Sequence, residues 1–244
     1  SGAVDVIVSD WFWVNLQRSR GDLLQLIPYS RAVGSLMVPG DSDILSIDNL
    51  KGKRIGIAGG PLSKGWLLLQ AAATKQGFDL AASSRPSYAA PPLLSESLKR
   101  GQLDATLTFW HFAARLQAGG LPLKDVQQQL GMQSDIPMLG YVFPQRWAEA
   151  NPALITGFAK AIDETKQALS NSAAAWDGVR PLMKAGSETE FEYLRQGYID
   201  GIPKPLNAQQ LKDAERFYAL LQKASDQYRN SHFDAHSFWQ ADAN

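Results

Sequence analysis

The 244-residue sequence contains no cysteine, which excludes disulfide bonds, thiolate metal sites and cysteine nucleophiles. It also lacks net charge, because 24 lysine and arginine residues balance 24 aspartate and glutamate residues. That balance is untypical of a dedicated nucleic-acid-binding surface. No apolar run reaches the roughly 18 residues that suggest a membrane-spanning helix. The first residues also lack the basic and then apolar layout of a signal peptide.

The composition that is present is typical of a globular protein. Hydrophobic residues make up 45% of the chain and charged residues 20%, which is enough apolar material for a sizeable core. The length is compatible with one large domain or two small ones, so the number of domains has to be decided from the order of the strands and helices.

Short apolar runs alternate with helical patterns over roughly the first 145 residues. Extended runs are predicted at residues 4–9, 23–28, 31–39, 54–58, 104–109 and 138–143, and helices at residues 11–18, 46–50, 63–76 and 93–100. Glycines at positions 52, 77 and 101 are expected to end helices in the left-handed conformation. The alternation predicts an α/β fold with mostly parallel sheets.

The last third of the sequence is predicted to be a helical layer. Asn151 and Pro152 are suited to the N-cap and first position of a long helix. Further helices are expected at residues 179–184, 189–198 and 208–227.

Three segments follow the carboxyl ends of predicted strands, where open parallel sheets bind ligands. The most specific of them contains Gly60, Ser63, Lys64 and Gly65 at the start of a helix. Glycines allow a close backbone approach, and the helix start, hydroxyl and cation together suit an anionic group. The order of residues differs from a phosphate-binding Walker loop. The alternative is a plain strand-to-helix turn with an exposed lysine.

Aromatic residues gather at the same strand ends. Trp11, Trp13, Trp66 and Trp110 are candidates for the walls of a ligand pocket, and each is alternatively a core residue. Asp10 precedes a predicted helix, which favours a capping role over contact with a ligand hydroxyl or amine.

Catalytic and metal-binding motifs are lacking. His232 and His236 have the i, i+4 spacing of zinc ligands, but they lack the glutamate of the H-E-x-x-H motif. There is no G-x-S-x-G nucleophile motif either. We therefore expect no metal, no cofactor and no enzymatic activity.

The sequence resembles the periplasmic substrate-binding proteins of ABC importers. The resemblance is carried in order by residues 2–10 (GAVDVIVSD), 47–57 (IDNLKGKRIGI) and 98–105 (LKRGQLDA), and it extends over residues 2–160. The branch that it resembles most binds sulfonates, taurine, nitrate and thiamine precursors.

This resemblance implies a type II periplasmic binding protein fold, in which two α/β lobes close on a ligand. Residues 1–39 would form part of the first lobe, residues 40–139 the second lobe, and residues 140–244 the return to the first lobe with the C-terminal helices. Residues 36–39 and 140–144 would be the crossings. The family pattern would place ligand contacts on two walls, formed by Ser9, Asp10, Trp11, Gly60, Ser63, Lys64, Gly65, Trp66 and Trp110.

One feature departs from the family pattern. Members begin with two further strand-and-helix units, roughly 60 residues by the size of such units. The sequence lacks these units, so we expect an incomplete first lobe with uncovered apolar surface, as in a truncated chain or gene fragment.

The resemblance predicts a periplasmic solute-binding component of an ABC importer, with the importer's membrane subunits as partners. Its expected ligand is a small anionic or zwitterionic molecule such as an aliphatic sulfonate or taurine. Two alternatives remain open, a thiamine-pyrimidine synthase-like enzyme of the same fold and the ligand-sensing domain of a receptor. That enzyme carries a cysteine-rich motif, which this sequence lacks.

Overall fold

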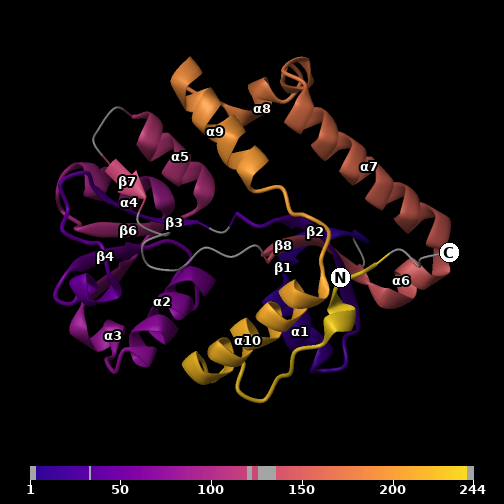
Figure 1. Cartoon of the computed structure of the whole chain (residues 1–244), viewed down its shortest axis with the longest axis horizontal. Helices are drawn as coiled ribbons and strands as arrows, with labels where there is room; N and C mark the ends of the chain where they lie inside the picture. Colours follow the sequence, from indigo (N-terminus) through magenta and orange to yellow (C-terminus); the bar gives the residue numbers. More distant parts are fainter. Residues whose placement is uncertain (1–3, 33, 120–122, 126–135, 241–244) are drawn as a thin grey trace.

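The computed structural model describes residues 4–32, 34–119, 123–125 and 136–240, and the strands in these ranges form two sheets (Figure 1). The smaller sheet has the order β1-β8-β2, with β1 at Ile7–Asp10, β8 at Leu139–Pro144 and β2 at Leu24–Ser30. The larger has the order β5-β4-β6-β3-β7, with β5 at Arg85–Tyr88, β4 at Arg54–Ile57, β6 at Ala105–Thr108, β3 at Ser35–Pro39 and β7 at Leu123–Asp125.

The α/β class is confirmed, but the strand directions are more mixed than the sequence predicted. Between the described strands, the only parallel pairs are those of β4 with β5 and with β6. Helices connect these three strands in sequence, as parallel neighbours require. All pairs of β3 and β8 are antiparallel. Strand β8 runs opposite to β1 and β2 because its first residue, Leu139, lies at the sheet end where they finish.

The crossings between the sheets are also displaced from their expected positions. Residues 36–39 lie inside the five-stranded sheet, in β3, and residues 140–144 lie inside the three-stranded sheet, in β8. The chain therefore changes sheets between Ser30 and Ser35 and again between Asp125 and Leu139.

All eight predicted helices are present with small shifts of their ends, the one at residues 46–50 as a 3-10 helix. They are α1 Trp11–Arg18, η1 Ile47–Leu50, α2 Lys64–Lys75, α4 Pro91–Lys99, α7 Pro152–Asn171, α8 Arg180–Met183, α9 Glu188–Asp200 and α10 Ala208–Ala224. The predicted left-handed glycines are confirmed, with φ of +74° at Gly52, +85° at Gly77 and +67° at Gly101. Asn151 and Pro152 occupy the N-cap and the first position of α7, as predicted. The Asn151 side chain makes no capping bond, and its amide instead donates to the Trp147 carbonyl at 2.9 Å.

Five short elements were not predicted. They are α3 Leu80–Ser83, α5 Trp110–Ala118, α6 Gln145–Ala150 and the strands β5 and β7. Two short 3-10 turns, η2 Ala174–Trp176 and η3 Ala235–Ser237, complete the described elements.

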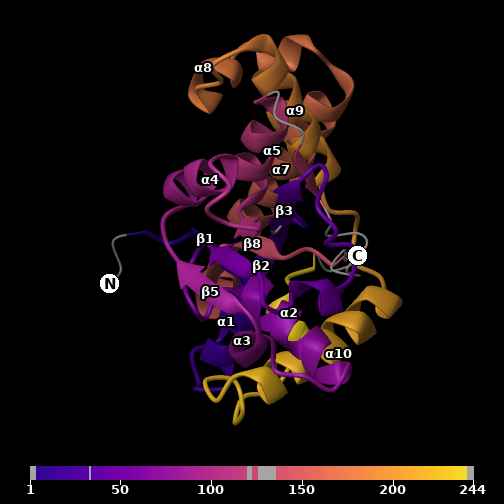
Figure 2. The same ribbon diagram turned by 90° about the vertical axis from the view of Figure 1, so that its left-hand side faces the viewer.

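The C-terminal helices connect the two halves of the molecule (Figures 1 and 2). Helix α9 packs on α5, which connects β6 and β7 of the five-stranded sheet. Arg115 of α5 forms an ion pair with Glu190 of α9. Helix α10 packs on α2, and its Tyr218 lies in one core with Trp11 and Phe12 of α1. The same core contains Leu67 of α2, so it includes elements from both halves.

Strand β1 lies at the edge of the three-stranded sheet and leaves apolar surface exposed. The side chains of Ile7 and Val8 are 43% and 53% exposed.

Candidate functional site

A cavity of about 320 Å³ lies between the two sheets. This volume is within the usual range for small-molecule sites. Its floor and walls come from the ends of β1 and β6, the start of α2, and the two chain segments that pass between the sheets. The lining residues are Asp10, Phe12, Gly34, Ala58, Gly59, Leu62, Ser63, Lys64, Gly65, Leu68, Leu107, Thr108, Phe109, Met138 and Leu139.

Asp10 forms the wall on the side of the three-stranded sheet. It is the last residue of β1 and the N-cap of α1, and its Oδ1 accepts a hydrogen bond of 2.7 Å from the Trp13 amide. This bond satisfies a helix-start donor and holds the carboxylate in place. The second carboxylate oxygen, Oδ2, lies within ion-pair distance of Lys64 on the opposite wall.

The opposite wall is the turn between β4 and α2. Gly59 and Gly60 have φ of +84° and +81°, which side-chain-bearing residues rarely adopt. Gly65 lets the first turn of α2 approach β6, since a Cβ at this position would lie 3.2 Å from Leu107 Cδ2. The first intrahelical bond in this turn joins the Leu67 amide to the Ser63 carbonyl, so the amides before it have no acceptor within the helix.

An ion pair joins the two walls. Lys64 Nζ lies 3.0 Å from Asp10 Oδ2, and the two side chains are 31% and 18% exposed. Asp10 belongs to the three-stranded half and Lys64 to the five-stranded half. Among the lining residues that the structure describes, they are the only formally charged ones, and their formal charges cancel.

Two buried hydroxyl groups in the lining have no hydrogen-bond partner within the described ranges. They are Ser63 Oγ, which does not cap α2, and Thr108 Oγ1 at the end of β6. Thr108 is only 2% exposed. A buried polar group without a partner is costly, so each of these hydroxyls suits a bond to a bound molecule.

The structure brings four of the predicted site residues together, namely Asp10, Ser63, Lys64 and Gly65. The other five do not line the cavity. Ser9 lies within β1, and Gly60 lies in the turn with nothing within 4 Å of a Cβ built on it. Trp11, Trp66 and Trp110 pack elsewhere in the protein.

The tryptophans do not form the expected aromatic wall. Trp11 and Trp66 are fully buried in separate hydrophobic cores, because α10 covers α1 and the five-stranded sheet covers the inner face of α2. Trp110 starts α5, and its ring lies against α9, 3.2 Å from a Cβ built on Gly197.

Most of the apolar lining was missed by the sequence reasoning. It includes Phe12, Leu62, Leu107 and Phe109, together with Met138 and Leu139 from the segment leading into β8. Phe12 and Phe109 adjoin the predicted strand ends, so their position was a usable signal. Met138 is distant in sequence from the other lining segments, and no local pattern indicates that it lines the cavity.

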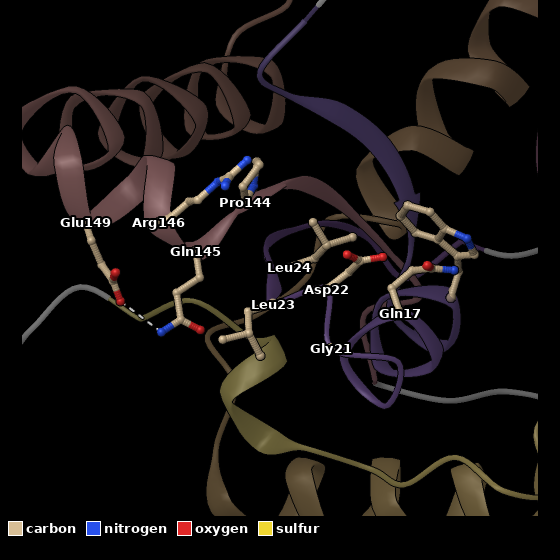
Figure 3. Close-up of a pocket in the computed structure, with 10 residues that line it drawn as sticks. Gln17, Gly21, Asp22, Leu23, Leu24, Pro144, Gln145, Arg146 and Glu149 are labelled. Carbon is tan, nitrogen blue, oxygen red and sulfur yellow. Dashed lines mark hydrogen bonds between the residues drawn. The ribbon is translucent and has the colours of Figure 1, made fainter. Parts of the chain in front are cut away.

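Trp13 lines a second cavity, of about 440 Å³, at the opposite end of the three-stranded sheet (Figure 3). The side chains of Asp22, Gln145, Arg146 and Glu149 surround it, and Gln145 Nε2 donates to Glu149 Oε1 at 2.9 Å. This cavity contains residues from only one half of the molecule. It therefore lacks the two facing walls of the first cavity.

The described residues contain neither a candidate metal centre nor a candidate membrane-spanning helix. Among the residues placed in the structure, no group of three histidine, cysteine, aspartate or glutamate side chains could hold a metal ion. In the same residues, no helix combines the length and the apolar character needed to cross a bilayer.

The protein therefore consists of two halves, each built on one sheet, and residues from both halves line the cavity between them. The family model described as NMT1/THI5 like matches residues 1–174, which is well over half of the chain. The chain belongs to the NMT1/THI5-like family. None of the curated proteins compared with the sequence matches it.

Solved structures with the same fold include several sulfonate-binding proteins. The alkanesulfonate-binding protein SsuA from Xanthomonas axonopodis pv. citri, bound to MOPS, is 18% identical with a TM-score of 0.66, and the match covers 98% of this chain and 81% of that one. A putative periplasmic sulfonate-binding protein SsuA from Methylobacillus flagellatus KT is 16% identical with a TM-score of 0.68, covering 98% and 73%.

The periplasmic aliphatic sulphonate binding protein SsuA from Escherichia coli is 17% identical with a TM-score of 0.61, and the match covers 96% of this chain and 76% of that one. At these identities the similarity establishes the type II periplasmic binding protein fold, and the ligand has to be argued from the cavity itself.

Proposed function

We propose that this chain is the solute-binding component of an ABC importer and that it captures a small organic molecule with an acidic group in the cavity between its sheets. The observation that carries the proposal is the cavity wall at α2. There Lys64, the start of α2 and the Ser63 hydroxyl line the same cavity as the Thr108 hydroxyl of β6, and neither hydroxyl has a hydrogen-bond partner among the described residues. Amides at a helix start and a nearby cation favour an anionic group.

Two further features support a binding role. The remaining lining is largely apolar, which suits the hydrocarbon part of an alkyl or aryl acid. Both halves contribute to the lining, so a ligand that contacts both favours the state in which they are close. Closure of this kind is the signal that the importer's membrane subunits would detect.

The proposed role implies a periplasmic location and small aliphatic sulfonates as the first ligands to test. SsuA proteins of the same fold support this choice. The division into lobes at residues 1–39, 40–139 and 140–244 remains a prediction, and β3 suggests moving its first boundary to before Ser35.

We further propose that the chain is not an enzyme. The thiamine-pyrimidine synthase alternative involves a cysteine-rich motif, and the sequence has no cysteine. The described cavity lining also contains no histidine. A receptor-sensing domain is compatible with the same cavity, but no observation favours it.

A ligand panel tests the proposal. Thermal stability is measured with alkanesulfonates, taurine, nitrate, carboxylates and pyrimidines, and binding of each hit is quantified by calorimetry. We expect stabilisation by one acid class, because only the folded state offers the site. The Lys64→Ala variant should bind that class at least about tenfold more weakly, a loss of about 1.4 kcal/mol.

Lys53→Ala is the matched control, because Lys53 pairs with Asp43 at 2.8 Å outside the cavity. Its affinity should equal that of the unmodified chain. Equal affinity in Lys64→Ala as well would contradict the assignment of the acidic group to α2. A panel without any stabilising compound would contradict the binding role for these classes.

A further inference from the structure

Lys64 does not face the cavity as a free cation, because Asp10 neutralises it from the opposite wall at 3.0 Å. The Asp10 carboxylate is held there by its second bond, the 2.7 Å cap to the Trp13 amide. No other formally charged residue is present among the lining residues that the structure describes. Among the described residues, the charges that a ligand meets in the cavity are therefore this balanced pair.

This balance has consequences for ligands of different charge. A simple anion that binds Lys64 competes with Asp10 and brings a second negative charge close to it. The helix start offsets only part of that repulsion, since its dipole is equivalent to about half an elementary charge. A molecule with both an acidic and an ammonium group can replace the single Asp10 to Lys64 pair with two pairs, one at each wall.

We propose that Asp10 is the specificity-determining residue of the cavity and that it selects a solute carrying an ammonium group as well as an acidic group. The acidic group binds Lys64 with the Ser63 and Thr108 hydroxyls, and the ammonium group binds Asp10. This inference rests on the proposed binding function and adds the charge pattern of the ligand. It also assigns Asp10 a role beyond capping α1.

Three probes of similar size separate the possibilities: taurine, which carries both groups, ethanesulfonate, which carries only the acid, and ethylamine, which carries only the base. Each is titrated by calorimetry into the unmodified chain and into the Asp10→Asn and Lys64→Gln variants. Asparagine is as good an N-cap as aspartate, so Asp10→Asn retains the start of α1. Thermal unfolding without ligand checks that both variants remain folded.

The unmodified chain should bind taurine at least about tenfold more tightly than ethanesulfonate, which corresponds to about 1.4 kcal/mol. In Asp10→Asn this ratio should fall to one or below, because Lys64 becomes a free cation and ethanesulfonate binds more tightly. In Lys64→Gln the preference should move to ethylamine, which Asp10 then binds alone.

The same titrations distinguish failure of this inference from failure of the proposed function. If the unmodified chain binds a sulfonate and the ratio of the two sulfonates is the same in Asp10→Asn, Asp10 does not set specificity and the binding function stands. If none of the three probes binds any of the three proteins, the inference fails together with the sulfonate assignment.

Discussion

Lys166 of α7 donates a hydrogen bond of 2.9 Å to the Pro28 carbonyl of β2, and its side chain is buried beside the Tyr29 ring. Burial lowers the pKa of Lys166 from 10.5 to about 8, with a smaller opposing effect from Asp163. The long C-terminal helix is therefore joined to the three-stranded sheet through a lysine that is charged at neutral pH and loses its proton in mildly alkaline solution.

The stability of the protein should rise with pH between about 8 and 10 because of Lys166. In this window the unfolded chain still holds the lysine proton and the folded chain has released it, so the free energy of unfolding increases with pH. The shift in pKa corresponds to about 3 kcal/mol over the whole window. Urea unfolding at several pH values measures the increase, which should be absent from Lys166→Met.

Lys160→Met is the control for this measurement. Lys160 lies on the same helix but is 74% exposed, and its ammonium is 3.8 Å from Glu164. The control should keep the pH dependence of the unmodified chain. Parallel curves for the unmodified chain and Lys166→Met would show that the pKa of Lys166 is not lowered by folding.

Gly140→Ala should destabilise the protein by about 1–3 kcal/mol, because the added methyl group overpacks the core. A Cβ at this position in β8 would overlap Leu26 Cδ1 and lie 2.9 Å from the Ile27 carbonyl oxygen, on the neighbouring strand β2. Chemical unfolding measures the loss.

Gly157→Ala provides the contrast. Gly157 lies inside α7 with nothing within 4 Å of a Cβ built on it. Alanine should stabilise the protein there by about 0.5–1 kcal/mol, through the lower entropy of the unfolded chain. If both variants lost the same stability, close packing at Gly140 would not be the cause.

Thr108→Val should weaken ligand binding without lowering stability. The Thr108 hydroxyl is buried in the cavity lining and lacks a hydrogen-bond partner within the described ranges, so valine removes only a bond that the ligand supplies. For the ligand identified by the panel, we expect a loss of about 1 kcal/mol or more in binding. Calorimetry measures the affinity, and thermal unfolding measures the stability.

Thr106→Val is the matched control on the same strand. Thr106 Oγ1 donates to the Gly56 carbonyl at 3.3 Å, and the residue does not line the cavity. This variant should lose about 1 kcal/mol of stability and keep the ligand affinity. The opposite pattern, with weaker binding in Thr106→Val and unchanged binding in Thr108→Val, would remove Thr108 from the site.

Elements with a strong local signal were predicted well. Strand β4, the glycine turn and helix α2 follow one another as the sequence indicated, because the apolar run, the left-handed glycines and the amphipathic pattern are properties of neighbouring residues. The same reasoning placed Asp10, Ser63, Lys64 and Gly65 at strand ends, and these four residues do line the cavity.

Elements that depend on distant partners were missed. Strand β5 contains Pro86, a residue rarely found inside strands, and is held by parallel pairing with β4. The antiparallel direction of β8 likewise depends on where the chain re-enters the three-stranded sheet. Neither feature is contained in the residues that form the element.

Neighbouring residues were sufficient to establish the α/β class, the glycine turn and the polar residues Asp10, Ser63 and Lys64 of the cavity lining. Long-range packing set the rest. Whether Trp11 faces a ligand or the core depends on Tyr218, which lies about two hundred positions further along the chain and covers it. Whether Lys64 is free or paired depends equally on Asp10, which belongs to the other sheet. Burial and charge pairing are properties of neighbours in space, and folding alone brings these neighbours together.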